Sequence, residues 1–146
     1  METKTFFIDL LPTGSLSSLE YQTIEKKTLN SRTYTKAILS GNLLNEVVFQ
    51  DVIFDHCIFF ATSFENCLFI NCLFLNCKFQ FSSFFACNFE STLWENCLWK
   101  FTTLKNSELI ESTGTIYLTL PIETTNRLGI SSRCQQNDLA DFNSIS

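Results

Sequence analysis

The sequence predicts an all-β solenoid, because large apolar residues and small residues both return with a period of five. The two columns run between Val47 and Glu111, and the small residue lies two positions before the large one. The large column is Phe49, Phe54, Phe59, Phe64, Phe69, Phe74, Phe79, Phe84, Phe89, Trp94, Trp99, Leu104 and Leu109. The small column is Val47, Val52, Cys57, Thr62, Cys67, Cys72, Cys77, Ser82, Cys87, Thr92, Cys97, Thr102 and Ser107. A fixed period of this kind indicates stacked repeats that share one core.

A period of five fits neither an α-helix nor a plain strand, whose side-chain periods are 3.6 and 2 residues. The chain must therefore turn a corner once in each repeat. On a short extended segment, residues two positions apart point to the same side, so both columns are expected inside the solenoid. The other three residues of each repeat are expected to form the corner and the outer wall, with successive turns about 4.8 Å apart.

Residues 37–41 (Ala-Ile-Leu-Ser-Gly) and 87–91 (Cys-Asn-Phe-Glu-Ser) are close to the pattern small–Asp/Asn–Leu/Phe–any–any of the pentapeptide-repeat family. The sequence resembles this family over residues 37–111, which is fifteen repeats or half of the chain. The resemblance implies a right-handed quadrilateral β-helix with four repeats per coil, and hence about four coils. The chain departs from the pattern in two ways: Ile, Val or Leu often precedes the large residue, and the corner residue varies freely, up to Phe81 and Phe101.

Residues 1–36 are expected to form an N-terminal cap and a degenerate first coil that closes one end of the rod. The five-residue phase continues through Leu19, Ile24, Leu29 and Tyr34. The alternative is a helix that opens with a capping box at Ser17 and Glu20. Thr and Tyr in this segment favour strand over helix.

Residues 112–146 are expected to form a C-terminal cap strand and a polar tail. The alternation in Thr115–Pro121 predicts one strand, which Pro121 ends. From Glu123 to Ser146 the chain is polar, and we expect this tail to be mobile or loosely docked.

The net charge and the cysteines limit the classes of function that we expect for this chain. The net charge is −5, and residues 37–111 carry all of it, with eight acids and three lysines. A basic nucleic-acid-binding face is therefore not expected. Six of the seven cysteines lie in the small column, where a free thiol serves as a small apolar filler. Unpaired thiols in this number favour a reducing, cytoplasmic compartment.

A four-repeat coil stacks Cys57, Cys77 and Cys97 in a ladder. Parallel inward side chains do not aim their sulfurs for a disulfide, and a ladder does not converge on a metal ion. His56 is the only histidine and lies at a corner, and the sequence has no glycine-rich phosphate loop. A filled rod offers no cavity for a substrate. We therefore expect no catalysis, no metal site and no cofactor. The apolar run near the N-terminus is too short and interrupted for a membrane span.

Folding the repeats four per coil places a set of aliphatic residues on two adjacent outer faces. These residues, the predicted wall, are Val48, Ile53, Leu68, Ile70, Leu73, Leu75 and Leu93. Contiguous apolar surface usually marks an interface, so a partner protein or a second copy of the chain is expected to bind there. The alternative is that the chain's own segment Phe6–Leu11 covers the wall.

Two functions are compatible with these features. The first is a protein-interaction module or scaffold that presents a stiff wall to a partner protein. The second is implied by the resemblance, because some acidic rods of the family mimic DNA and modulate DNA gyrase. Four coils span roughly 19 Å, and DNA of that length carries about eleven phosphates. The repeat charge of −5 is less than half of that number, which favours the scaffold.

Overall fold

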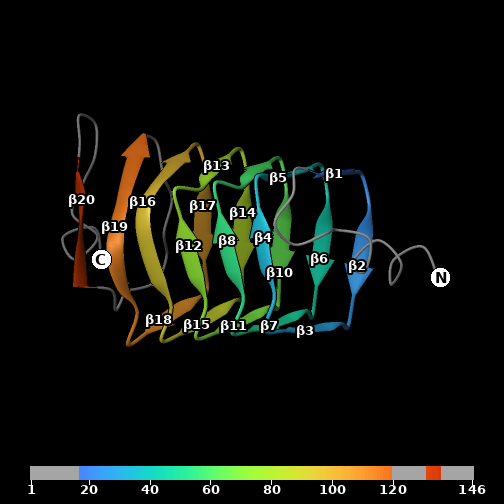
Figure 1. Cartoon of the computed structure of the whole chain (residues 1–146), viewed down its shortest axis with the longest axis horizontal. Helices are drawn as coiled ribbons and strands as arrows, with labels where there is room; N and C mark the ends of the chain where they lie inside the picture. The colour runs from blue at the N-terminus through green and yellow to red at the C-terminus, as the bar shows by residue number, and fades with distance from the viewer. Residues whose placement is uncertain (1–16, 120–130, 136–146) are drawn as a thin grey trace.

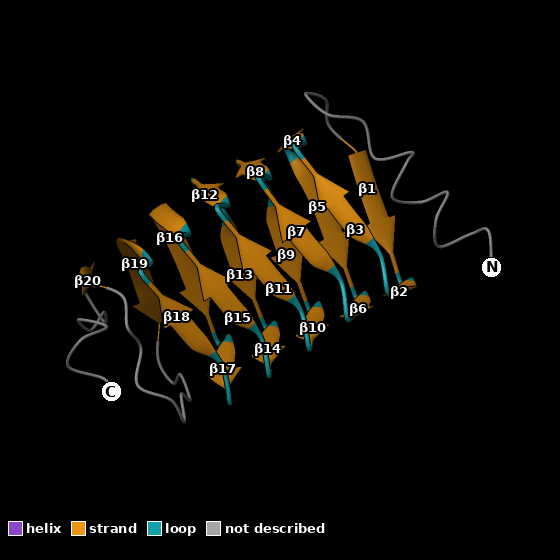
Figure 2. Ribbon diagram, turned by 90° about the horizontal axis from the view of Figure 1, so that it is seen from below, coloured by secondary structure: helices purple, strands orange, loops and turns teal. Residues whose placement is uncertain are grey.

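The computed structural model describes residues 17–119 and 131–135, and every regular element in them is a β-strand. The strands wind around the long axis of a rod, and successive coils stack along that axis (Figure 1; Figure 2). Strands one coil apart pair in parallel, so the predicted β-helix with four repeats per coil is confirmed. The described residues form about five coils, one more than the repeat region alone predicts.

The strands form four faces, numbered here in chain order. Face 1 contains β1 (Ser17–Glu20), β5 (Ala37–Ser40), β9 (Ile58–Phe60) and β13 (Lys78–Gln80). Face 2 contains β2 (Thr23–Glu25), β6 (Leu43–Asn45), β10 (Ser63–Glu65), β14 (Ser83–Phe85) and β17 (Thr103–Lys105). Face 3 contains β3 (Thr28–Asn30), β7 (Val48–Gln50), β11 (Leu68–Ile70), β15 (Asn88–Glu90) and β18 (Glu108–Ile110). Face 4 contains β4 (Thr33–Thr35), β8 (Ile53–Asp55) and β12 (Leu73–Leu75).

Two longer strands join face 4 to face 1. Strands β16 (Leu93–Lys100) and β19 (Thr113–Thr119) each continue around the corner between these faces, so their strands form a single ten-stranded sheet. Up to the first residues of β19, the register in every face places a residue above the one twenty positions earlier, as in the pair Phe64 and Phe84. The backbone therefore stacks each column on itself, coil after coil.

Both predicted columns point into the rod. Every residue of the large and small columns between Val47 and Leu109 is buried. Most of the large rings stack in parallel on their neighbours one coil away: the Phe59 and Phe79 centroids are 4.5 Å apart, and those of Phe74 and Trp94 are 4.2 Å apart. The Phe79 and Trp99 rings are tilted by 57° instead. The small residues satisfy backbone carbonyls of the preceding coil, as when the hydroxyl of Ser82 donates to the carbonyl of Phe59 at 3.1 Å. A short side chain with a donor is what this position needs.

Residues 17–36 fold as strands, not as the alternative helix, because their apolar residues continue the large column. Leu19, Ile24, Leu29 and Tyr34 are all buried. Long polar residues nevertheless occupy the matching small positions, and Gln22, Lys27 and Arg32 are half-buried there. No described coil precedes them, so their side chains have room at this end of the rod.

The five-residue period ends at Gly114 for a steric reason. Gly114 occupies the position of the large column and pairs with Trp94. A Cβ at Gly114 would lie 1.8 Å from the Trp94 carbonyl oxygen. The register then shifts, because Ile116 pairs with Cys97 and is buried in its place. This last turn uses one residue fewer than the others, and the strand predicted at 115–121 is observed as β19.

The polar tail contributes a strand that the sequence did not suggest. Strand β20 (Ser131–Gln135) pairs in parallel with residues 113–117 of β19. The expectation of a mobile or loosely docked tail did not include this strand, which needs no apolar pattern because an edge strand can pair through its backbone alone whatever its side chains are. The expectations for residues 1–16, 120–130 and 136–146 lie outside the described residues.

Candidate protein-binding surfaces

The structure places the predicted wall on faces 3 and 4, where all seven side chains point outward and are half-buried. Ile53, Leu73 and Leu93 pair in register and form a ladder across β8, β12 and β16. Val48 and Leu68 form a shorter ladder on face 3. The wall is therefore two aliphatic ladders on neighbouring faces.

The other two wall residues, Leu75 and Ile70, have polar or charged neighbours in their columns. Leu75 pairs with Asp55 on one side and Glu95 on the other. Ile70 lies between Gln50 and Glu90. These two side chains therefore stand as single aliphatics between polar residues, and they do not extend the ladders.

A second apolar surface lies at the corner between faces 1 and 2. Phe60, Phe81 and Phe101 are 42%, 56% and 38% exposed, and we call them the aromatic ridge. The Phe81 ring contacts the other two, with centroids 5.7 Å from Phe60 and 5.4 Å from Phe101. Corner residues vary freely along the sequence, so the five-residue period alone does not indicate this cluster. The twenty-residue spacing of Phe81 and Phe101 was the signal that could have found it.

The corner residues adopt a left-handed backbone conformation. In the described residues, eighteen residues other than glycine have a positive φ, and the corners recur every five positions. Asn tolerates this conformation better than most residues do, and Asn66, Asn71, Asn76 and Asn96 all occupy such corners. Phe81 at φ +53° and Phe101 at φ +50° are unusual choices for the same position.

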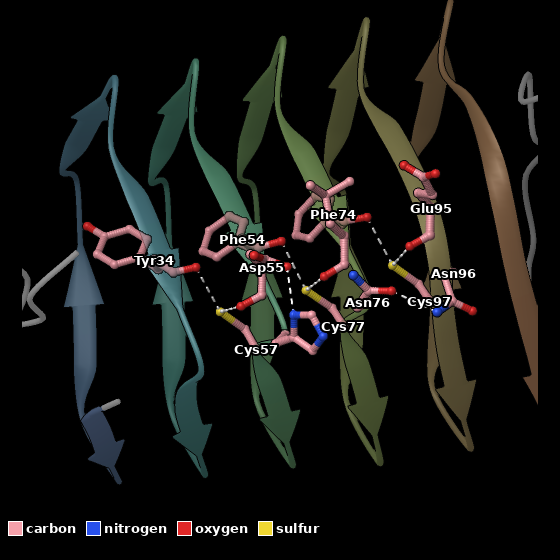
Figure 3. Close-up of polar contacts among 12 residues, drawn as sticks. Tyr34, Phe54, Asp55, Cys57, Phe74, Asn76, Cys77, Glu95, Asn96 and Cys97 are labelled. Carbon is pink, nitrogen blue, oxygen red and sulfur yellow. Dashed lines mark hydrogen bonds and ion pairs between the residues drawn. The ribbon is translucent and has the colours of Figure 1, made fainter. Parts of the chain in front are cut away.

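A shallow groove runs along the corner between faces 4 and 1, with a volume of about 390 Å³. It is lined by His56, Asn76, Cys77, Lys78, Asn96, Leu98 and Tyr117. Asn96 donates to the Asn76 side-chain oxygen at 2.7 Å, and the His56 ring lies 2.8 Å from a carboxylate oxygen of Asp55 (Figure 3). The groove is therefore lined by polar side chains at its corner and by Lys78, Leu98 and Tyr117 on face 1.

The cysteine ladder beside this groove is structural. Cys57, Cys77 and Cys97 lie in successive coils, and each thiol points at backbone carbonyls (Figure 3). The Cys77 thiol donates to the Phe54 carbonyl at 3.3 Å, and the Cys97 thiol to the Phe74 carbonyl at 3.2 Å. The six cysteines with described side chains are buried and free of disulfides.

Side-chain hydrogen bonds with Cys77 and Cys87 lower the pKa of Cys57 and of Cys67, respectively. Burial makes the thiols of Cys72 and Cys77 poor nucleophiles and poor metal ligands. It raises the pKa of Cys72 to about 11, and it also raises the pKa of Cys77. Both thiols are therefore protonated at neutral pH, and the thiolate is the reactive and metal-binding form. Among the described residues, no group of three or more His, Cys, Asp or Glu side chains is arranged to hold a metal ion.

The rod interior contains a small void of about 30 Å³ between its N-terminal coils. Apolar side chains of the large column surround it, including Ile24, Leu39 and Phe59. A void of this size has room for about one water molecule and offers it no polar partners. Within the described parts of the chain, no helix has the length and apolar character needed to cross a membrane.

Comparisons with known proteins were made for both sequence and structure. No model of a known protein family matches the sequence, and no curated protein matches it. The structure is similar to the pentapeptide-repeat protein Rfr23 from the cyanobacterium Cyanothece 51142, with 14% identity and a TM-score of 0.41 over 88% of this chain and 97% of that one.

Two trypsin-treated forms of QnrB1, a plasmid-mediated fluoroquinolone resistance protein, are also similar. One shares 14% identity at a TM-score of 0.36 over 72% of this chain and 67% of that one. The other shares 12% identity at a TM-score of 0.39 over 70% and 73% of the two chains. All these TM-scores are below 0.5, so the fold described above rests on the strand pairing of this chain itself.

Proposed function

We propose that this chain is a non-enzymatic protein-interaction module, a stiff rod that binds a partner protein through the predicted wall on faces 3 and 4. The observation that carries the proposal is the outward ladder of Ile53, Leu73 and Leu93. Three aliphatic side chains in register on the outside of a filled rod are not needed to fill its core. They form a strip of apolar surface of the kind that marks interfaces.

The same repeat position on face 2 shows what the fold itself requires. There, the residues before the large column in three successive coils are Ser63, Ser83 and Thr103, which follow Leu43 and pair in register like the aliphatic ladder. Short polar side chains therefore serve this position equally well. Cross-strand aliphatic contacts stabilise a sheet by only about 0.2–1 kcal/mol per pair, which is little reason to place three aliphatics against water.

The chemistry of the described side chains supports a binding role over catalysis. The thiols are buried, and those of Cys72 and Cys77 are protonated at neutral pH, while His56 is exposed at a corner beside Asp55. A catalytic base or nucleophile needs a substrate pocket, and the groove beside His56 is shallow. A flat wall suits a protein partner better than a small substrate.

The distribution of carboxylates supports a scaffold over a DNA mimic. DNA presents a phosphate at regular short intervals. On the described faces and corners, no outward column has carboxylates in two adjacent coils. On face 4, for example, Leu75 separates Asp55 from Glu95, and on face 2 Asn45 separates Glu25 from Glu65.

The test compares two charge substitutions in the same coil. Leu73→Asp introduces a charge into the wall, and Ser63→Asp introduces it at the matching repeat position on face 2. Immobilised wild-type protein is expected to capture a partner from extract of the native cells, Ser63→Asp to retain it, and Leu73→Asp to lose it with an unchanged melting temperature. Each buried aliphatic contributes roughly 1.5–3 kcal/mol to an interface. Retention of every partner by a folded Leu73→Asp variant would contradict the proposal.

A further inference from the structure

Face 1 has a ridge along one edge and a groove along the other. The aromatic ridge follows its corner with face 2, and the groove follows its corner with face 4. Both features lie beside the same three strands. The ridge lies at the ends of β9, β13 and β16, and the groove lies where these strands begin on face 1. The ridge and the groove therefore lie at the same level along the rod.

The aromatic ridge destabilises the folded chain. Left-handed backbone is unfavourable for most residues, and Phe81 and Phe101 both adopt it while their rings remain in contact with water. Asn at this corner would be less strained and more soluble, and Asn76 and Asn96 hold the corresponding position at the corner between faces 4 and 1. The fold requires left-handed backbone at its corners but not an aromatic residue there. Residues held in an unfavourable backbone conformation often accompany function.

The ring geometry decides which ligand the ridge fits. Phe81 and Phe101 stack on each other with an angle of 11° between their planes. Each ring therefore turns one flat face towards the other ring, and the Phe60 ring meets Phe81 at an angle of 79°. The three rings do not form a single flat platform on which a sugar or a base could stack. The rings form a narrow apolar ridge, which fits a groove on another protein.

We propose that two copies of this chain pair through face 1, with the aromatic ridge of each copy in the groove of the other. A two-fold axis parallel to the rod exchanges the two edges of face 1 and keeps each coil at its level. The ridge of one copy then meets the groove of the second copy twice, once on each side of the axis. This is the self-complementary arrangement that a two-fold interface requires.

The side chains between the two edges are compatible with this pairing. Each face 1 strand has two outward residues, one before and one after its large-column residue. The axis places the first of these on one copy opposite the second on the other copy. Ile58 then lies opposite Phe60, and Lys78 lies opposite Gln80, as strand positions in β9 and β13. Leu98 lies opposite Lys100, whose aliphatic stem can pack on it while the charge stays in water.

The charge and the area of face 1 predict a weak dimer. From Ile38 to Lys100 the outward positions of its described strands carry Lys78 and Lys100 and no carboxylate. Five coils give a face roughly 24 Å long, and about 500 Å² would be buried on each copy, the low end for specific interfaces. We therefore expect micromolar association that tightens slightly with added salt, since salt screens the lysines.

The experiment measures mass by sedimentation velocity from about 1 μM to 1 mM, a range that brackets a weak interface of this size. The ridge variant is Phe81→Asn, which installs the residue that other corners already hold. The groove variant is Leu98→Asp, and the control is Phe85→Asn, which removes an aromatic residue that is 45% exposed on face 2. The wild type and the control are expected to dimerise alike, and the ridge and groove variants at least tenfold more weakly.

Mixing the two weak variants tests the geometry itself. A mixed pair keeps one intact ridge in one intact groove, so the mixture is expected to contain more dimer than either variant alone. An arrangement with ridge against ridge would give no such gain. A wild type that stays monomeric over the whole range, an equal loss with Phe85→Asn, or no gain on mixing would each overturn the proposal. The result is independent of the wall on faces 3 and 4, where Leu73→Asp is expected to leave the dimer unchanged.

Discussion

Aromatic rings stack from coil to coil in two regions of this molecule, the interior of the rod and the aromatic ridge outside it. Inside, the Phe59 and Phe79 centroids are 4.5 Å apart and both rings are fully buried. Outside, the Phe81 and Phe101 centroids are 5.4 Å apart, and 56% and 38% of these residues remain exposed. The coil spacing thus brings aromatic residues that recur after twenty positions into contact, and most such pairs stack, although the Phe79 and Trp99 rings are tilted by 57°. The two stacks differ in how much of their aromatic surface is removed from water, and this burial supplies most of the stabilising free energy.

The largest expected effect comes from truncating an interior ring. Phe74 is 1% exposed and stacks on Phe54 and Trp94. Phe74→Ala should lower the free energy of unfolding by about 3–5 kcal/mol, because it removes buried surface and leaves a cavity. Phe81→Ala should lower it by less than about 1 kcal/mol, as is usual for surface substitutions. Denaturant melts of both variants make the comparison, and equal losses would show that the five-residue register is wrong.

A smaller effect is expected from a buried thiol at high pH. The pKa of Cys72 is raised from 9.0 to about 11 because burial disfavours the thiolate. The folded state holds this proton more tightly than the unfolded state, so the stabilisation is complete below pH 9 and is lost as the pH rises to 11. The loss amounts to about 2–3 kcal/mol, at about 1.4 kcal/mol per pKa unit.

The matched variant is Cys72→Ser, which keeps a short donor for the Phe49 carbonyl but does not titrate in this range. Unfolding free energies of both proteins at pH 8 and at pH 11 give the effect as a difference, so that the tyrosines and lysines common to both cancel. The wild type is expected to lose more stability than the variant. Equal losses would mean that the Cys72 thiolate is accommodated in the folded rod.

The smallest expected effect has the opposite sign. Phe81→Asn should leave the melting temperature unchanged or raise the unfolding free energy by up to about 1 kcal/mol, because Asn tolerates the left-handed corner better. The same substitution is expected to weaken the dimer. A clear loss of stability in the monomer would show that the outer ring stack helps to hold the fold, and the distinction between the two regions would fail.

The sequence predicts the interior well because the inward positions are constrained twice. They must be apolar or small, and they must recur in phase, so the columns that contain Phe74 and Cys77 can be read directly. The first coil was predicted in the same way from Leu19 and Tyr34, despite polar residues at its small positions. Corner positions carry only a backbone constraint, so the exposure of Phe81 does not follow from the period.

Two features at the C-terminal end could not be predicted from the sequence, for other reasons. Strand β20 pairs through its backbone with β19, and its residues show no apolar alternation. Gly114 reads as an ordinary turn residue, although it stands in the large column against the Trp94 carbonyl. In both cases the determinant is contact with another coil, which a local pattern does not contain.

The four repeats in each coil also limit how this protein can change length. Inserting one five-residue repeat would turn every later residue by a quarter of a revolution around the rod. Phe101 would then leave the corner of Phe60, and Leu93 would leave the column of Ile53. Only a whole coil of twenty residues, placed before Gly114, lengthens the rod and keeps each outer surface aligned. A lineage that depends on these surfaces can therefore grow or shrink only in steps of one coil.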